Sequence, residues 1–337
     1  MKEKMMKNIV NISPLQCDKL MMNNSKIVHE LAMIPSVIGG GECVFRCMKN
    51  KSILTTIDLC DEENIKFSGE ITARDIAVMD SIYTIYATGA EYFTLDQVVQ
   101  VYMGDMNVDI TPKMRREVKR SVDKLMSTIV RIDCTEEFRN RKIIDKDDKM
   151  IFNSNILYLK YLEGSKVYYT VNGRISSSKV VYRFLGEEAP VLFQYAEAIG
   201  QIITIPMNLL SVGSNTDVSV EICRYIYKQI HYMKYSQKHS RNRRADRIAL
   251  YRYDLKEKAY VGVLPYVGIR KEDFVIVLPD GKEDTRPWRK KKQRVCKFVK
   301  SYLEMLVSED VIKGYSPYYE RNQAGNNMEL AGYEIKI

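Results

Sequence analysis

The feature that most constrains this fold is a basic, amphipathic stretch at residues 286–315 of the 337-residue chain. Its apolar residues recur at steps of three and four, which predicts a helix with one buried stripe. The stripe consists of Val295, Phe298, Val299, Tyr302, Leu303 and Leu306. Between Arg286 and Lys300 there are eight Lys or Arg and no Asp or Glu, although the start of a helix is itself partially positive. We therefore expect compensation from outside the helix, and a polyanion would supply it because bound phosphates release their counterions.

The residues after this helix predict a hairpin. Apolar residues at 311–315 are followed by a polar, Gly-containing loop at 322–327, and apolar residues return from Tyr333 onwards. A helix followed by a hairpin is typical of the end of a winged helix, the helix-turn-helix variant that places its last helix in a major groove. The alternative interpretation is a basic surface helix with a solvated face.

Positive charge is concentrated in one part of the chain. Residues 231–300 hold 20 Lys or Arg and 8 Asp or Glu, whereas the remainder holds 32 basic and 35 acidic residues. This distribution indicates a localised site for a polyanion rather than general solubility. The length suits two domains that each bury a core of their own.

Upstream, residues 70–171 predict three helices followed by strands. The signals that begin the helices are Thr72, Thr94 with its capping-box partner Gln97, and Thr111 followed by Pro112. Gly89 and Gly104 end the first two helices. The strand-like segments are residues 129–134, 156–162 and 166–171. Three helices and a hairpin again predict a winged helix.

The same order returns in the second half of the chain. A connecting helix and turn at 185–210 precede a long helix at 218–235, a strand at 248–253, a short helix at 264–269 and the basic helix with its hairpin. We therefore predict an α+β fold with two tandem winged-helix domains joined by a helical linker. The predicted parts are an N-terminal extension at 1–68, the first domain at 69–180, the linker at 181–215 and the second domain at 216–337.

Four segments carry a resemblance to a known family. They are ITARDIAVMDSIYTIY, TPKMRREVKRSVDKLMSTIVRID, IITIPMNLLSV and FVKSYLEMLVSEDVIKGY. Over residues 70–337 they resemble the replication initiator proteins of plasmids and related mobile elements. The resemblance implies two winged-helix domains that bind repeated DNA sites at an origin, dimerisation through the first domain, and no enzymatic activity. The insertions at 136–155 and 238–247 depart from the family's pattern.

The chain lacks the sequence signals of enzymes that act on DNA, and we predict that it is not an enzyme. The glycines at 39–41 are not followed by the lysine and hydroxyl of a P-loop. The three histidines, His29, His231 and His239, include no adjacent pair for the metal of a nicking enzyme. A recombinase or nuclease built around His239 and its neighbouring arginines is the alternative from another class. Phosphate contact by a basic loop explains those arginines more simply.

No metal or cofactor site is predicted. The two sets of candidate ligands are His29 with Cys43, Cys47 and Cys60, and the carboxylates of Asp145, Asp147 and Asp148. The first set does not match a common zinc spacing, which favours buried thiols, and the second is typical of a solvated turn. Seven cysteines without a disulfide rhythm, no secretory signal and no long apolar run predict a cytoplasmic protein that does not enter a membrane.

The candidate DNA contacts fall into three groups. They are Lys113, Arg115, Arg116, Lys119 and Arg120 in the helix at 111–127; Arg241, Arg243, Arg244 and Arg247 in the basic insertion; and Arg286, Arg289, Lys290, Lys291, Lys292, Gln293, Lys297 and Lys300 in the last helix. Arginine at such positions reads guanine edges and glutamine reads adenine, whereas the insertion would follow the phosphate backbone.

These observations predict a protein that binds specific sequences of double-stranded DNA and starts replication of a plasmid or integrated mobile element at origin repeats. A homodimer through the first domain and host replication proteins are the further partners expected. A transcriptional regulator would use the same fold, so that alternative stays open. An assembly protein that binds RNA or an acidic partner through its basic face is a further alternative.

Overall fold

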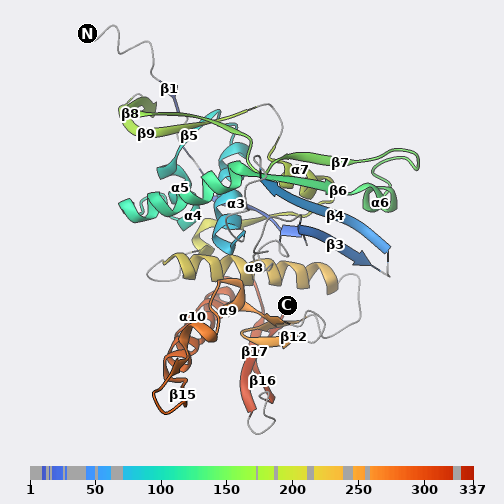
Figure 1. The fold of residues 1–337 in the computed structure, drawn as a ribbon, viewed down its shortest axis with the longest axis vertical. Coiled ribbons are helices and arrows are strands. Elements are labelled where there is room, and N and C mark those ends of the chain that lie inside the picture. Colours follow the sequence, from blue (N-terminus) through green and yellow to red (C-terminus); the bar gives the residue numbers. More distant parts are fainter. Residues whose placement is uncertain are drawn as a thin grey trace. The chain divides into compact units, whose positions relative to one another are not determined.

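The computed structural model describes residues 10–12, 15, 17–25, 27–28, 43–49, 52–61, 71–171, 174–185, 189–210, 216–237, 246–254, 259–321 and 328–337. By internal packing the chain divides into two compact units, residues 1–208 and 209–337 (Figure 1). Both units combine helices with sheets, so the mixed α+β class is confirmed. The four domain bounds expected from the sequence stay predictions.

Three helices form the centre of unit 1. They are α3 (Ala73–Ala87), α4 (Leu95–Met103) and α5 (Pro112–Ser127). Thr72 and Thr94 each form the reciprocal bonds of a capping box, with Asp75 and Gln97 respectively, and Thr111 caps α5. The predicted starts of all three helices are therefore confirmed. The predicted ends are confirmed as well, because Gly89 and Gly104 take left-handed φ values of +78° and +70° just after α3 and α4.

A buried ion pair fixes α5 against α3. The Asp75 carboxylate accepts hydrogen bonds from Ser121 Oγ at 2.6 Å and from Lys124 Nζ at 2.7 Å. The Asp75 side chain is only 3% exposed, so removing either partner would leave a buried group without its counter-charge. The basic helix of unit 1 is thus attached to its core partly by charge.

The first sheet of unit 1 has the order β1-β8-β9-β5. Its strands are β1 (Val10–Asn11), β5 (Tyr92–Thr94), β8 (Leu159–Val171) and β9 (Arg174–Phe184). The two strands predicted at 156–162 and 166–171 form one long strand, β8. The pairing of β8 with β9 shifts register between Glu163 and Val167. The gap expected between two strands is therefore an irregularity within one strand.

The strand predicted at 129–134 is confirmed as β6 (Thr128–Asp133), and it pairs with a strand from the N-terminal segment. The second sheet has the order β3-β4-β6-β7, from β3 (Cys43–Lys49), β4 (Ser52–Asp61), β6 and β7 (Ile151–Asn155), with α6 (Thr135–Asn140) between the last two. Strand β2 (Lys19–Asn23) pairs with β10 (Ile202–Pro206), which follows α7 (Val191–Ala198). The Asn23 backbone N–H also donates to Asp80 of α3 at 3.0 Å. Residues expected as an extension therefore belong to the packing of unit 1.

Unit 2 begins with the long helix α8 (Asp217–Gln237) and ends with α10 (Arg286–Ser308), β16 (Gly314–Arg321) and β17 (Met328–Lys336). Between them lie β11 (Arg247–Ala249), β12 (Arg252–Asp254), β13 (Ala259–Val261), α9 (Val263–Tyr266), β14 (Ile276–Val277) and β15 (Glu283–Asp284). The strand predicted at 248–253 is two strands, because β11 pairs with β17 whereas β12 pairs with β13.

The two units share one order of elements. When the inserted elements are left aside, each unit contains the order helix, short strand, helix, helix and hairpin; the insertions are β6, α6 and β7 between α5 and β8 in unit 1, and β12, β13, β14 and β15 between β11 and α10 in unit 2. Each unit also pairs its short strand with the last strand of that hairpin. In unit 1 the pair is β5 with β9, and in unit 2 it is β11 with β17; both are antiparallel. In unit 2, β11 and β17 approach so closely that position 332 requires a glycine. A Cβ at Gly332 would lie 2.1 Å from the Ile248 carbonyl oxygen. The third helix, α5 or α10, precedes the hairpin in both.

Candidate nucleic-acid interface

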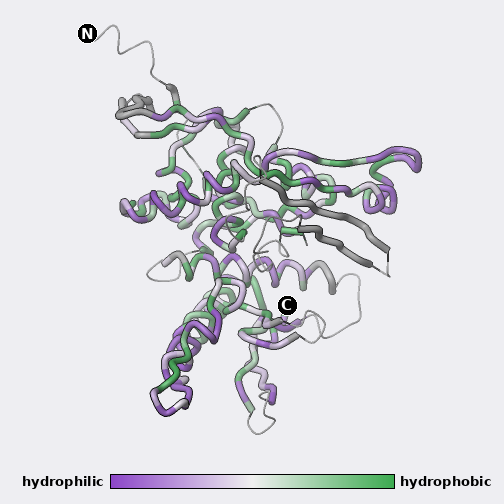
Figure 2. The backbone as a smooth tube through the Cα atoms, viewed as in Figure 1, coloured by the Kyte–Doolittle hydropathy of each residue, from purple (hydrophilic) through white to green (hydrophobic). Residues whose placement is uncertain are grey.

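Helix α10 presents a continuous cationic face. Its buried residues are Trp288, Val295, Val299, Tyr302, Leu303 and Leu306, and its tube in Figure 2 alternates between hydrophilic and hydrophobic segments. The exposed positions on the opposite side are Arg289, Lys290, Gln293, Arg294, Lys297 and Lys300. Within the part of the chain that the structure describes, no ion pair involves Arg289, Lys290, Arg294 or Lys297. These four cations are available for a ligand.

Four cations of the predicted run are engaged inside unit 2. One of them, Lys300, lies 3.8 Å from Glu304 of the same helix. Lys292 Nζ lies 3.2 Å from Glu329 Oε2, and Lys291 Nζ lies 5.8 Å from the centre of the Phe274 ring. Arg286 Nη2 lies 2.8 Å from Asp284 Oδ2. Their contribution to a nucleic-acid contact would require these interactions to break.

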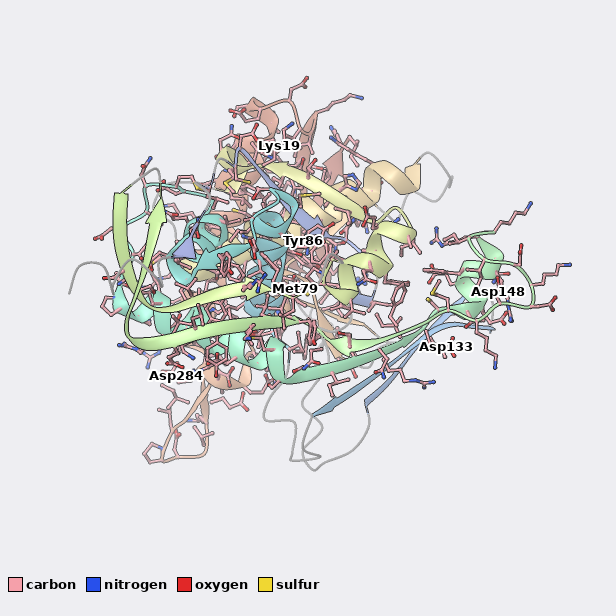
Figure 3. All side chains as sticks on the ribbon, turned by 90° about the horizontal axis from the view of Figure 1, so that it is seen from above. Lys19, Met79, Tyr86, Asp133, Asp148 and Asp284 are labelled. Carbon is pink, nitrogen blue, oxygen red and sulfur yellow. The ribbon has the colours of Figure 1, made fainter. Side chains whose placement is uncertain are left out.

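Asp284 supplies part of the compensation expected outside the helix. Its carboxylate accepts the Arg286 backbone N–H at 2.9 Å as well as the guanidinium, and Figure 3 labels it at the start of α10. The side-chain bond from Arg286 lowers the pKa of Asp284 to about 2. The Asp284 carboxylate also interacts electrostatically with Arg289. Farther along α10, Lys292 and Lys300 pair with Glu329 and Glu304, whereas Lys290, Arg294 and Lys297 are in no described ion pair.

An aromatic cluster holds the start of α10. Trp288 is 7% exposed and packs edge-on against Tyr251, with ring centres 4.9 Å apart, and against Phe274 at 6.4 Å. Tyr251 stacks in turn on Tyr260 of β13 at 4.2 Å. The sequence pattern did not reveal this cluster, because its members lie up to 37 positions apart along the chain.

In unit 1 the basic residues of α5 are mostly paired. Arg115 makes two hydrogen bonds to the Asp96 carboxylate of α4, at 2.6 and 3.0 Å. Lys119 Nζ lies 2.9 Å from Asp123 Oδ2, and that hydrogen bond raises the pKa of Lys119. Lys113 lies 3.8 Å from Glu117. The predicted stripe of cations is thus largely neutralised by its own unit.

Arg116 and Arg120 are the exceptions on α5. Both are exposed, and no ion pair involves them among the residues that the structure describes. They lie four positions apart and therefore share one face of the helix. They are the residues of α5 best placed to reach a phosphate or a base.

The two units also differ in formal net charge. Residues 1–208 contain 27 basic and 27 acidic residues, whereas residues 209–337 contain 25 basic and 16 acidic residues. The whole net charge of +9 therefore belongs to unit 2.

The predicted basic insertion is described only at its end. Arg241, Arg243, Arg244 and His239 lie outside the described residues, as do His29 and the glycines at 39–41. Arg247 is the first residue of β11; it lies 2.7 Å from Glu334 and stacks 4.9 Å from the centre of the Tyr318 ring. Arg247 is therefore held on the sheet of unit 2.

Sequence reasoning missed one exposed cation, Arg294. It lies four residues after Lys290 and three before Lys297, so helical spacing places it beside the predicted contacts. The signal was present in the run of basic residues, and the helical periodicity alone would have added this position.

The described residues contain no group of three His, Cys, Asp or Glu side chains arranged to hold a metal. Asp145, Asp147 and Asp148 are all exposed before β7, where Figure 3 labels Asp148. The Asp148 backbone N–H donates to the Asp145 carbonyl at 3.3 Å, so the predicted solvated turn is confirmed. Burial raises the pKa of the Cys134 thiol to about 12, so it is not poised as a thiolate ligand. The side chains of Cys43, Cys47 and Cys60 lie outside the described part.

Comparison with known proteins gives distant likenesses. No protein-family model and no curated protein matches the chain. A crystal structure of selenomethionine derivatives of domains 2 and 3 of RctB is similar with a TM-score of 0.41 and 10% identity, over 93% of this chain and 97% of that one. A second structure of RctB domains 2–3 has a TM-score of 0.36 and 13% identity, over 77% of this chain and 86% of that one. TM-scores below 0.5 at 10% and 13% identity do not assign a function to this chain.

No helix in the described part of the chain is both long enough and apolar enough to cross a membrane.

Proposed function

We propose that the chain is a sequence-specific, double-stranded DNA-binding protein whose two units are winged helices. The observation that carries this proposal is the exposed face of α10, where Arg289, Lys290, Arg294 and Lys297 are in no described ion pair. A major groove admits an α-helix, and cations along the exposed face of such a helix can neutralise phosphates. The repeated order of helices and hairpin supports the winged-helix assignment.

Within this proposal the residues of α10 have different roles. Gln293 and Arg294 lie in the middle of the exposed face, where an amide can read adenine and a guanidinium can read guanine. Arg289 and Lys290 lie near the start of the helix and contact phosphates, which adds affinity without sequence information. Arg116 and Arg120 of α5 form a second and weaker contact.

We further propose that the biological role is initiation of replication at origin repeats in a plasmid or an integrated mobile element. The support is the resemblance of the four sequence segments to initiator proteins, which spans residues 70–337. Dimerisation through unit 1, contact with host replication proteins and a cytoplasmic location belong to the same proposal. A transcriptional regulator with the same units is the outcome that the next experiment distinguishes.

The test is recovery of bound genomic DNA followed by footprinting of the purified chain. Direct repeats spaced by whole helical turns next to the coding region support an initiator. A single palindrome within a promoter would instead identify a regulator, and no preferred site at all would contradict sequence-specific binding.

The proposal includes the absence of enzymatic activity. Purified protein is expected neither to hydrolyse ATP nor to nick supercoiled DNA in the presence of magnesium or manganese. Cleavage that persists through purification and is lost in the His239→Ala variant would overturn this part and support a recombinase or nuclease.

A further inference from the structure

A short hairpin before α10 exposes three consecutive apolar residues. Ile276, Val277 and Leu278 are 53%, 69% and 38% exposed. In the part of the chain that the structure describes, no other run of three large apolar residues is exposed. Such a run is unfavourable in water unless something covers it, so it marks a candidate interaction surface.

The exposure is built into an ordered turn. Ile276 pairs with Asp284 and Val277 with Glu283, and the Leu278 backbone N–H donates to the Lys282 carbonyl at 2.8 Å. Gly281 closes the turn with a φ of +79°, a conformation that favours glycine. The apolar side chains are therefore presented by a defined hairpin.

The hairpin is a sheet of two strands only, β14 and β15. Each strand pairs on one side, so both outer edges of the ladder carry unpaired backbone groups in the described structure. Two strands alone are marginally stable, and a third strand or a covering element is the usual remedy. A strand added to one edge would pair the backbone and cover the apolar side chains together.

The charge around the hairpin excludes DNA as the natural occupant. Residues 272–284 contain five acidic side chains and one basic one. Asp280 and Asp284 pair with Lys282 and Arg286, which leaves Glu272, Asp273 and Glu283 outside the described ion pairs. Glu283 lies across from Val277, and opposed residues of an antiparallel pair project to the same face. Phosphates would be repelled from this face, while lysine or arginine side chains would be attracted.

We propose that the β14–β15 hairpin binds an extended segment of a partner protein, in which apolar residues alternate with Lys or Arg, as an added strand. The backbone edge supplies hydrogen bonds, Ile276 to Leu278 supply apolar contact, and the surrounding carboxylates select basic residues. This surface shares no residue with the exposed face of α10, so the inference goes beyond the proposed DNA binding and does not depend on it.

The experiment uses the full chain and three short fluorescent peptides. One alternates Lys with Val, one alternates Glu with Val, and one is the Lys–Val peptide with a central proline, which cannot donate to a ladder. We expect the Lys–Val peptide to bind roughly tenfold more tightly than either of the others, since several cross-strand pairs are gained together. Equal binding of the Lys–Val and Glu–Val peptides would overturn the charge selection, and equal binding of the proline peptide would overturn strand addition.

The matched variant is Ile276→Ser combined with Val277→Ser. It should lose about tenfold in affinity for the Lys–Val peptide through the missing apolar pairs, with unchanged fluorescence from Trp288, which is the only tryptophan of the chain. Unchanged peptide affinity in this variant would overturn the proposal. Conversion of a dimer to a monomer would instead assign the hairpin to a second copy of the chain, and weaker binding to a random-sequence duplex would assign it to DNA; either result overturns a protein partner.

Discussion

The two units share an order of helices and hairpin, but they differ in how many cations of the third helix are paired with carboxylates. Helix α5 of unit 1 carries six Lys or Arg, of which all but Arg116 and Arg120 lie against a carboxylate of their own unit. Helix α10 of unit 2 carries eight, and four of them are in neither an ion pair nor a cation–π contact among the described residues. A similar sequence pattern thus yields a mostly neutral face in one unit and a free cationic face in the other.

The difference matters because a paired cation contributes less to binding a polyanion. A surface ion pair is worth only about 0–1 kcal/mol, so it can exchange its carboxylate for a phosphate. After the exchange, however, the carboxylate still lies near the phosphate. Its negative charge offsets the positive charge of the cation, so the pair attracts a phosphate less than a free cation does. We therefore expect α10 to supply most of the affinity that depends on salt.

The anchors of the two helices differ as well. Trp288 fixes the start of α10 by aromatic packing, whereas Asp75 holds α5 through Lys124 and Ser121. Trp288→Ala should lower the free energy of unfolding of unit 2 by about 3–5 kcal/mol through the cavity it leaves. Asp75→Ala should lower that of unit 1 by about 3 kcal/mol, because Lys124 loses its partner. Denaturant unfolding followed by circular dichroism measures both.

The control for these stability measurements is Val277→Ala. This side chain is 69% exposed, so the substitution should change the free energy of unfolding by less than about 0.5 kcal/mol. If Trp288→Ala behaved like this control, the aromatic cluster would not anchor α10.

The next largest effect concerns the free cations of unit 2. Changing Arg289, Lys290 and Lys297 together to glutamine should lower affinity for any duplex about 100-fold near physiological salt, since about three phosphate contacts are lost. Fluorescence anisotropy with a labelled duplex measures it. Lys282→Gln removes an exposed cation from the hairpin before α10 and should leave binding unchanged; a comparable loss in that variant would mean that only net charge matters.

A smaller effect separates base reading from phosphate contact. Gln293→Ala should cost about 1–3 kcal/mol on the preferred site, because the amide no longer reads a base edge, and almost nothing on random sequence. Competition binding with the two duplexes provides the measurement. Equal losses on both would show that Gln293 does not read sequence and that α10 is a charged clamp.

The smallest effect tests whether ion pairs within unit 1 weaken its binding to DNA. Asp96→Asn removes the carboxylate that holds Arg115 at 2.6 Å while keeping the size of the side chain. Loss of this ion pair should raise affinity for duplex DNA by up to about fivefold near physiological salt, as one added phosphate contact does. The same substitution in an Arg115→Gln background is the control, because no cation is then released. An unchanged affinity in both would show that α5 does not approach the DNA.

Much of this fold could be predicted from the sequence because its signals are local. The capping boxes at Thr72 and Thr94 and the stripe of α10 each depend on residues within a few positions of one another. Strand partners were harder, since β2 pairs with β10 and β4 with β6 across long stretches of chain. No local pattern encodes such pairings.

The same limit applies to the candidate site. Helical spacing predicted that Gln293, Lys297 and Lys300 would face away from the core, and all three are exposed. Lys291 and Lys292, which were also candidate contacts, are half-buried. Helical spacing did not indicate that Asp96 would pair with Arg115 or Glu329 with Lys292, because those partners lie 19 and 37 residues away and are brought close only by the fold. The distinction between free and neutralised cations is therefore a tertiary property.

The most direct test of the difference between the units is the salt dependence of binding by two matched double variants. One changes the free residues Arg289 and Lys297 to glutamine, and the other changes the paired residues Arg115 and Lys119 in the same way. On one duplex, the logarithmic salt slope should fall by about two units in the first variant and by less than about one in the second. Equal falls in slope would contradict the account, because they would show that ion pairing within unit 1 does not withhold its cations from DNA.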